Sequence, residues 1–159
     1  MISEPKQVVP SQNLPEQIVC QKANNNLDLA FYKGRLFLAF RTAPFHFASS
    51  KTHLYIISSS NLGESWDFEA EVFMGTDMRE PRFLILGDRL LFYFFEAGKN
   101  PFTFTPKHIY AMERIRQGKW TKPVKVFKDG CVLWRAKVRN GTAYATVYCG
   151  GEGEYTGKN

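Results

Sequence analysis

Apolar and polar residues alternate in short runs along this chain, and a turn signal interrupts each run. Three such runs align without gaps: DLAFYKGRLFLAFR (Asp28–Arg41), RFLILGDRLLFYFF (Arg82–Phe95) and RAKVRNGTAYATVY (Arg135–Tyr148). A period of two residues predicts strands. The central Lys-Gly, Gly-Asp and Asn-Gly pairs are typical of tight hairpin turns, which need a positive φ. Each run is therefore predicted to form a β-hairpin.

The predicted hairpins recur at a nearly fixed interval. They start at residues 28, 82 and 135, so that successive copies begin 54 and 53 residues apart. Two more predicted strands follow each of the first two hairpins, and Trp66 and Trp120 mark corresponding places between them. The third strands of the two repeats are His53–Ser60 and His108–Ile115, and the fourth strands are Phe68–Phe73 and Pro123–Phe127.

Four antiparallel strands in a repeat of about 53 residues are typical of a β-propeller blade. We expect an all-β chain with an extended N-terminal leader (residues 1–25), a first blade (26–78), a second blade (79–131) and part of a third (132–159). Closed propellers have about 4–8 blades. The chain is therefore expected to be a fragment of a five- or six-bladed propeller, with open edges that permit self-association. A β-sandwich with evenly spaced strands is the alternative.

One turn carries a recognisable motif, SSNLGESW, which ends at Trp66. It resembles the Asp-box (BNR) repeat of sialidases, Ser-x-Asp-x-Gly-x-Thr-Trp. Asn61 occupies the Asp position, which keeps an oxygen that can cap the turn but loses its charge, and Gly63 permits positive φ. The second copy keeps only Trp120 and has moved its glycine to Gly118. In sialidases these boxes lie away from the catalytic face, so the motif indicates a fold.

The resemblance covers residues 24 to about 150 and implies a sialidase-like member of the glycosyl hydrolase-like propellers. In such propellers the ligand face lies where the first strand of each blade begins and the second strand ends. The alignment of the repeats then selects the candidate positions. Asp28, Arg82 and Arg135 are expected to begin first strands, Arg79 and Glu80 to precede one, and Arg41, Phe95 and Tyr148 to end second strands.

Arginines on one face suit an acidic ligand, because a guanidinium binds a carboxylate through two parallel hydrogen bonds. Sialidases hold the carboxylate of sialic acid with three arginines. The resemblance implies that substrate is bound by Arg41, Arg79, Arg82, Arg135 and Tyr148. The alternative is that these arginines form salt bridges with Asp28 and Glu80 that stabilise the fold.

Catalysis in a retaining sialidase needs a Tyr nucleophile activated by Glu and an acid/base carboxylate. In the family that Tyr lies in late blades. Asp28 is the acid/base candidate and Glu80 is its rival. We expect the 159-residue chain alone to be inactive.

Composition narrows the possible partners. The chain is 44% hydrophobic and 15% aromatic with a formal net charge of +6, which favours a folded domain and anionic partners. It contains no block of about five like charges and no nucleic-acid module, so we expect no nucleic-acid partner. No run of about 18 apolar residues predicts a membrane span. No signal peptide is visible, which leaves the compartment unknown and cytoplasmic by default.

The sequence contains no motif typical of a cofactor site and no cysteine spacing typical of a metal site or a disulfide framework. The sequence contains no phosphate-binding Gly-rich loop, HExxH or GxSxG motif, so neither a cofactor nor a metal is expected. Cys20, Cys131 and Cys149 lack CxxC or Cys/His spacing, which predicts no disulfide framework.

The leading hypothesis is a sialidase-like glycoside hydrolase propeller that acts on or binds a glycan, which we expect to be acidic. The alternative is a non-catalytic propeller that binds carbohydrate or protein. Exposed aromatic side chains in the loops after the second strands suit either function, and the candidates are Phe45, Phe47, Phe102 and Phe104.

Overall fold

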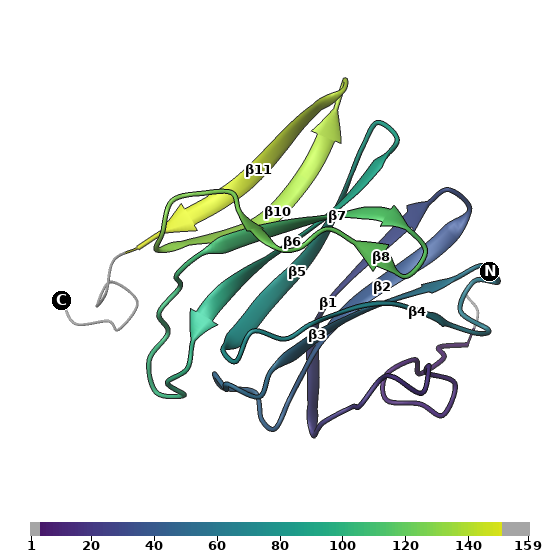
Figure 1. Cartoon of the computed structure of the whole chain (residues 1–159), viewed down its shortest axis with the longest axis horizontal. Coiled ribbons are helices and arrows are strands. Elements are labelled where there is room, and N and C mark those ends of the chain that lie inside the picture. Colours follow the sequence, from purple (N-terminus) through teal and green to yellow (C-terminus); the bar gives the residue numbers. More distant parts are fainter. Residues whose placement is uncertain (1–3, 151–159) are drawn as a thin grey trace.

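The computed structural model describes residues 4–150, which form eleven strands and no helix (Figure 1). These residues therefore provide no helix that is long and apolar enough to cross a membrane. In chain order the strands are β1 (Ala23–Tyr32), β2 (Arg35–Ala43), β3 (His53–Ser59), β4 (Asp67–Val72), β5 (Asp77–Leu86), β6 (Arg89–Gly98), β7 (Ile109–Arg116), β8 (Lys119–Trp120), β9 (Val124–Lys125), β10 (Cys131–Arg139) and β11 (Thr142–Cys149).

The strands form three antiparallel sheets, which confirms the all-β prediction. Sheet 1 has the order β1-β2-β3-β4, sheet 2 has the order β5-β6-β7-β8 with β9 also paired to β7, and sheet 3 is the hairpin β10-β11. None of the three sheets closes on itself. Figure 1 shows the sheets fanned out with β1, β5 and β10 as neighbours, and β5 contacts both other strands. These three are called the inner strands below.

Each inner strand contains a β-bulge at a corresponding position. The register shifts at Asn26 in β1, at Glu80–Pro81 in β5 and at Trp134 in β10, so that successive bulges lie 54 residues apart. Asn26 and Glu80 both have positive φ, at 47° and 50°, where a residue with a Cβ is uncommon. A bulge re-aims side chains and increases local twist. The recurrence therefore gives the three inner strands the same bend.

The predicted start of the first strands was wrong by several residues. The inner strands begin at Ala23, Asp77 and Cys131, so that Asp28, Arg82 and Arg135 lie midway along them. The segments ANNN and DMRE are rich in residues that are depleted in strands, which is why sequence patterns place them in loops. Pairing with the ends of β2 and β6 outweighs that propensity, because it satisfies their backbone groups.

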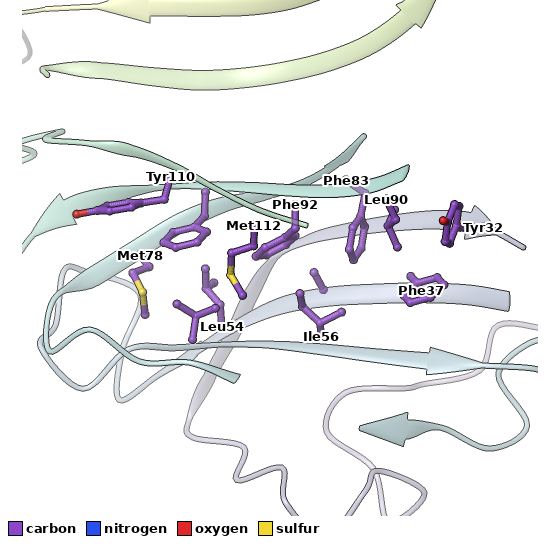
Figure 2. Close-up of a cluster of buried hydrophobic side chains, with 13 residues drawn as sticks. Tyr32, Phe37, Leu54, Ile56, Met78, Phe83, Leu90, Phe92, Tyr110 and Met112 are labelled. Atoms are coloured by element: carbon purple, nitrogen blue, oxygen red, sulfur yellow. The ribbon is translucent and has the colours of Figure 1, made fainter. Parts of the chain in front are cut away.

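The main core lies between sheet 1 and sheet 2, as Figure 2 shows. Phe37 on β2 and Phe92 on β6 are fully buried there, and the Phe37 ring contacts Phe83 edge-on with centroids 6.2 Å apart. Burial of one such side chain contributes about 1.5–3 kcal/mol. A second, smaller cluster joins sheet 2 to sheet 3. A third lies on the other face of sheet 1, where residues of the N-terminal segment pack against it, namely Val8, Val9, Leu14 and Ile18.

The Asp-box-like turn is held by its own side chains. Asn61 Oδ1 accepts a hydrogen bond from Ser65 N at 3.0 Å, and Ser59 Oγ accepts one from Gly63 N at 2.8 Å. Gly63 has a φ of +91°, and an added Cβ would lie 3.3 Å from the Trp66 ring. Trp66 itself is buried against sheet 1. The Asn in place of Asp therefore still caps this turn.

A disulfide joins the two ends of the third hairpin, which corrects the expectation of unpaired cysteines. Cys131 and Cys149 are bonded to each other, and the β10–β11 register places them directly opposite. Their separation of 18 residues matches no metal or redox spacing, so sequence alone gave no signal. Cys20 is free and half-buried, and burial raises the pKa of its thiol.

A buried carboxylate ties the outer strands of sheets 1 and 2 together. Glu69 on β4 accepts two hydrogen bonds of 2.9 Å from the Arg114 guanidinium on β7. It also accepts hydrogen bonds from Ser58 Oγ at 2.7 Å and Gly118 N at 3.2 Å. A buried charge is costly unless it is paired and hydrogen-bonded. Glu69 meets both conditions.

Replacing Glu69 by alanine is expected to lower the free energy of unfolding by about 3 kcal/mol, because Arg114 would stay largely buried without its carboxylate. Urea denaturation followed by tryptophan fluorescence measures the loss. Glu71→Ala is the matched control on the same strand. The Glu71 side chain is 40% exposed, so this change should cost less than about 1 kcal/mol. Equal losses in the two variants would contradict the role assigned to Glu69.

Candidate functional site

The candidate site lies where β2 ends and β5 begins, and its base is a fully buried ion pair. Arg41 on β2 and Asp77 on β5 both have 0% exposed side chains. Asp77 Oδ1 accepts hydrogen bonds from Arg41 Nη2 at 2.6 Å, Arg41 Nε at 3.0 Å and Thr52 Oγ1 at 2.7 Å. Arg41 Nη2 also donates to the Phe47 carbonyl at 3.0 Å. The pair therefore fixes the loop between β2 and β3 against sheet 2.

A second arginine shares the same carboxylate. Arg79 Nε donates to Asp77 Oδ2, and Arg79 Nη2 donates to the His46 carbonyl at 3.0 Å. Two guanidiniums thus meet one carboxylate, which leaves an excess of positive charge. Burial lowers the pKa of Arg41, Asp77 opposes that effect, and the charge of Arg79 lowers the pKa further. An anion brought beside Arg79 would relieve this repulsion.

A groove of about 400 Å³ opens beside Arg79. Its walls come from the loop between β2 and β3 and the loop between β6 and β7, and the lining residues are Phe47, Ala48, Arg79, Pro101, Phe102, Thr103 and Phe104. Phe47 is 62% exposed and Phe102 is 93% exposed. Large aromatic side chains at this exposure are typical of surfaces that bind a ligand or a partner.

The second carboxylate of the sequence prediction, Glu80, lies on the β5 bulge and has structural partners. It forms an ion pair with Arg82, and it accepts a hydrogen bond of 2.6 Å from Asn26 Nδ2 on β1. Arg82 also donates to the Trp134 carbonyl on β10 at 2.8 Å. These contacts connect all three inner strands through their bulges.

Asp28 is also used by the fold. Its Oδ2 accepts a hydrogen bond of 2.6 Å from the backbone N–H of Phe83, which joins β1 to β5. This contact suits a strand-to-strand bridge, and it engages one of the two oxygens of the Asp28 carboxylate.

The predicted binding residues are only partly brought together. Arg41 and Arg79 share Asp77, whereas Arg82 pairs with Glu80. Arg135 is exposed on β10, and Tyr148 on β11 lies with its ring 6.1 Å from the Trp134 ring. The structure therefore groups Arg41 and Arg79 on one carboxylate, with Arg79 alone of the two lining the groove, and distributes Arg82 and Arg135 along the inner strands.

Sequence patterns missed the residue that organises the site. Asp77 precedes the predicted first strand of the second repeat, and a single Asp beside Met and Arg carries no motif. Thr52 and His46 lie in a loop whose conformation no repeat constrains. Within residues 4–150 no group of three or more His, Cys, Asp or Glu residues is arranged to hold a metal ion.

Comparisons of this chain with family models, with curated proteins and with solved structures gave no match.

Asp77→Asn is expected to lower the free energy of unfolding by about 3 kcal/mol, because it leaves the buried Arg41 guanidinium without a counter-charge. Thermal and urea unfolding measure the change. Asp67→Asn removes a charge from an ion pair with Arg35 in which Asp67 is 51% exposed, and it should cost less than about 1 kcal/mol. A neutral effect of Asp77→Asn would show that the pair does not hold the site together.

Proposed function

We propose that this chain forms part of a sialidase-like β-propeller and binds an acidic glycan in the groove beside Arg79. The observation that carries the proposal is the sharing of one carboxylate, Asp77, by Arg41 and Arg79. The excess positive charge borders a groove lined by aromatic side chains. An acidic sugar offers a carboxylate for the arginine and apolar ring faces for the aromatic residues.

The propeller arrangement is supported by the way the sheets repeat. Sheets 1 and 2 each contain four consecutive antiparallel strands, and their first strands lie beside the first strand of sheet 3. The bulges recur every 54 residues. Consecutive four-stranded antiparallel sheets around a common centre are the architecture of propeller blades. The hydrogen-bonded turn from Ser59 to Trp66 supports the resemblance to Asp-box proteins.

The two arginines that share Asp77 have different roles in this proposal. Arg41 is fully buried, so it acts through Asp77 by holding Arg79 in place. The hydrogen bonds of Arg79 within residues 4–150 use its Nε and Nη2, which leaves Nη1 for an oxygen of the ligand. Charge-assisted hydrogen bonds of this kind contribute about 1.5–3 kcal/mol.

Binding is favoured over hydrolysis by the contacts of the two candidate catalytic carboxylates. Asp28 bridges β1 to β5, and Glu80 is paired with Arg82. A glycosidase needs one carboxyl group that protonates the leaving oxygen. Neither carboxylate lines the groove beside Arg79. Of the two hypotheses drawn from the sequence, we therefore propose the second, a non-catalytic propeller that binds its ligand without hydrolysing it.

Arg79→Ala is expected to weaken binding of 3′-sialyllactose at least tenfold, because a charge-assisted hydrogen bond is lost. Titration followed by NMR chemical shifts measures the dissociation constant. Arg139→Ala is the matched control, since Arg139 is exposed at the tip of sheet 3. The control should bind like the unchanged protein, and neutral lactose should bind more weakly than the acidic sugar. Equal binding of both sugars, or an equal loss in Arg139→Ala, would contradict the proposal.

Hydrolysis is expected to be absent. The 159-residue chain should release no fluorophore from 4-methylumbelliferyl sialoside above the buffer rate, because Asp28 and Glu80 serve contacts between strands. A fluorescence assay over several hours at a high concentration of the chain tests this. Turnover that disappears in Arg82→Ala would contradict the prediction and would favour a catalytic propeller.

A further inference from the structure

Hydrogen bonds join His46, in the loop between β2 and β3, to both arginines that share Asp77. Arg41 Nη1 donates to Asn25 Oδ1 at 3.2 Å, and Asn25 Nδ2 lies 3.1 Å from His46 Nδ1. The His46 carbonyl accepts a hydrogen bond from Arg79 Nη2 at 3.0 Å. Because Arg41 and Arg79 both donate to Asp77, these contacts form a closed ring.

The order of the contacts determines which nitrogen of His46 carries a hydrogen. A guanidinium has only donors, so the Asn25 atom that faces Arg41 must be the side-chain oxygen. The other end of the Asn25 amide is then its NH2 group, which can only donate. His46 Nδ1 must therefore accept, and the hydrogen of the neutral imidazole lies on Nε2. A protonated imidazole carries a hydrogen on both nitrogens and cannot form this contact.

The same ring holds one wall of the groove. Phe47 follows His46 in the chain, its carbonyl accepts a hydrogen bond of 3.0 Å from Arg41, and its side chain lines the groove. The rings of His46 and Phe47 contact each other edge-on with centroids 6.1 Å apart. A displacement of His46 would therefore move both the Phe47 side chain and the carbonyl that holds Arg79.

The surroundings of His46 give this contact more weight than a hydrogen bond between two mobile surface groups would have. His46 is exposed, but its partner Asn25 is half-buried and is oriented by the fully buried Arg41. The charged groups joined to this loop are Arg41 from β2 and Arg79 and Asp77 from β5, with a summed charge of +1. A proton on His46 would raise that charge to +2 and would remove the acceptor at the same time.

We propose that His46 is a positioning residue of the groove. Its neutral Nε2–H tautomer holds the loop between β2 and β3, and protonation of its imidazole releases the loop. Ligand binding beside Arg79 is therefore expected to weaken as the pH falls. The part of this role that concerns the ligand rests on the proposed glycan binding, whereas the tautomer and the loop are properties of the chain alone.

The tautomer is measured on the whole chain by long-range proton–nitrogen NMR spectra of the imidazoles at about pH 8, where imidazoles are mostly neutral. We expect the hydrogen of His46 on Nε2 and none on Nδ1. In Asn25→Asp the partner group can only accept, so the hydrogen should move to Nδ1. A hydrogen on Nδ1 of His46 in the unchanged chain would overturn the proposal, whether or not the variant folds.

Binding of 3′-sialyllactose measures the effect of His46 on the groove. His46→Asn keeps an acceptor, because asparagine carries its oxygen on Cγ as histidine carries Nδ1, and it should bind like the unchanged chain at about pH 8. His46→Leu removes the acceptor and should bind about fivefold more weakly, the ratio that corresponds to one hydrogen bond. Equal affinities of these two variants would contradict the positioning role.

A change of pH distinguishes titration of His46 from a purely structural role. Between about pH 8 and about pH 5 imidazoles become protonated, whereas the carboxylate of the sugar stays ionised. The unchanged chain should lose about fivefold in affinity over this interval, with lower NMR order parameters in residues 44–50. His46→Asn should show neither change. His53→Asn is the matched control, since His53 is paired with Glu71 outside the groove, and it should behave like the unchanged chain.

Failure of this role and failure of glycan binding give different results. If the unchanged chain binds no sialyllactose, glycan binding is wrong, while the tautomer and the order parameters still decide the role of His46. If the order parameters of residues 44–50 are the same at both pH values, His46 does not hold the loop, and the binding role of Arg79 stands. If affinity falls equally with pH in His46→Asn, the pH dependence belongs to another group and the proposal is wrong.

Discussion

The carboxylate of Asp77 is the interaction on which the arrangement of the two large sheets depends. It is completely buried between sheet 1 and sheet 2 and is paired with Arg41, while Thr52 and Arg79 complete its shell. Buried ion pairs repay their desolvation only when hydrogen bonds satisfy the remaining polar atoms. This network satisfies them from β2, β5 and the loop between β2 and β3, so a shift of any of these elements would leave a buried charge unpaired.

The polar residues of the inner strands perform a related task nearer the centre. A bulge leaves a backbone residue outside its own ladder, and here the bulged residues make contacts between strands instead. Asn26 donates to Glu80, and Arg82 donates to the carbonyl of Trp134. Three apolar hairpins packed only through their faces could slide along one another, whereas directional hydrogen bonds fix one register. Polar residues in apolar strands therefore need not indicate catalysis, which is the ambiguity that the sequence left open.

The hairpins were predictable because they depend on local chemistry. Alternating apolar residues and the pairs Lys33-Gly34 and Asn140-Gly141 determine where strands and turns fall, and these pairs have the positive φ that their turns need. The strand beginnings, the Cys131–Cys149 disulfide and the role of Asp77 depend on pairing between segments that lie far apart in sequence. A repeat identifies equivalent positions but not the contacts between one repeat and the next, so the candidate site was predicted only in part.

Charge balance distinguishes the arginines better than their position in the repeat does. Arg82 is balanced by Glu80, and Arg114 is balanced by Glu69. Arg41 and Arg79 share Asp77 alone, so the positive charge of this group exceeds its negative charge by one. A positive charge with aromatic neighbours in a groove attracts an anion more strongly than one on an open surface, because the groove walls reduce screening by water. The excess positive charge of this group borders the groove beside Arg79, so the network that holds the two large sheets together is also the basis on which an acidic ligand is proposed.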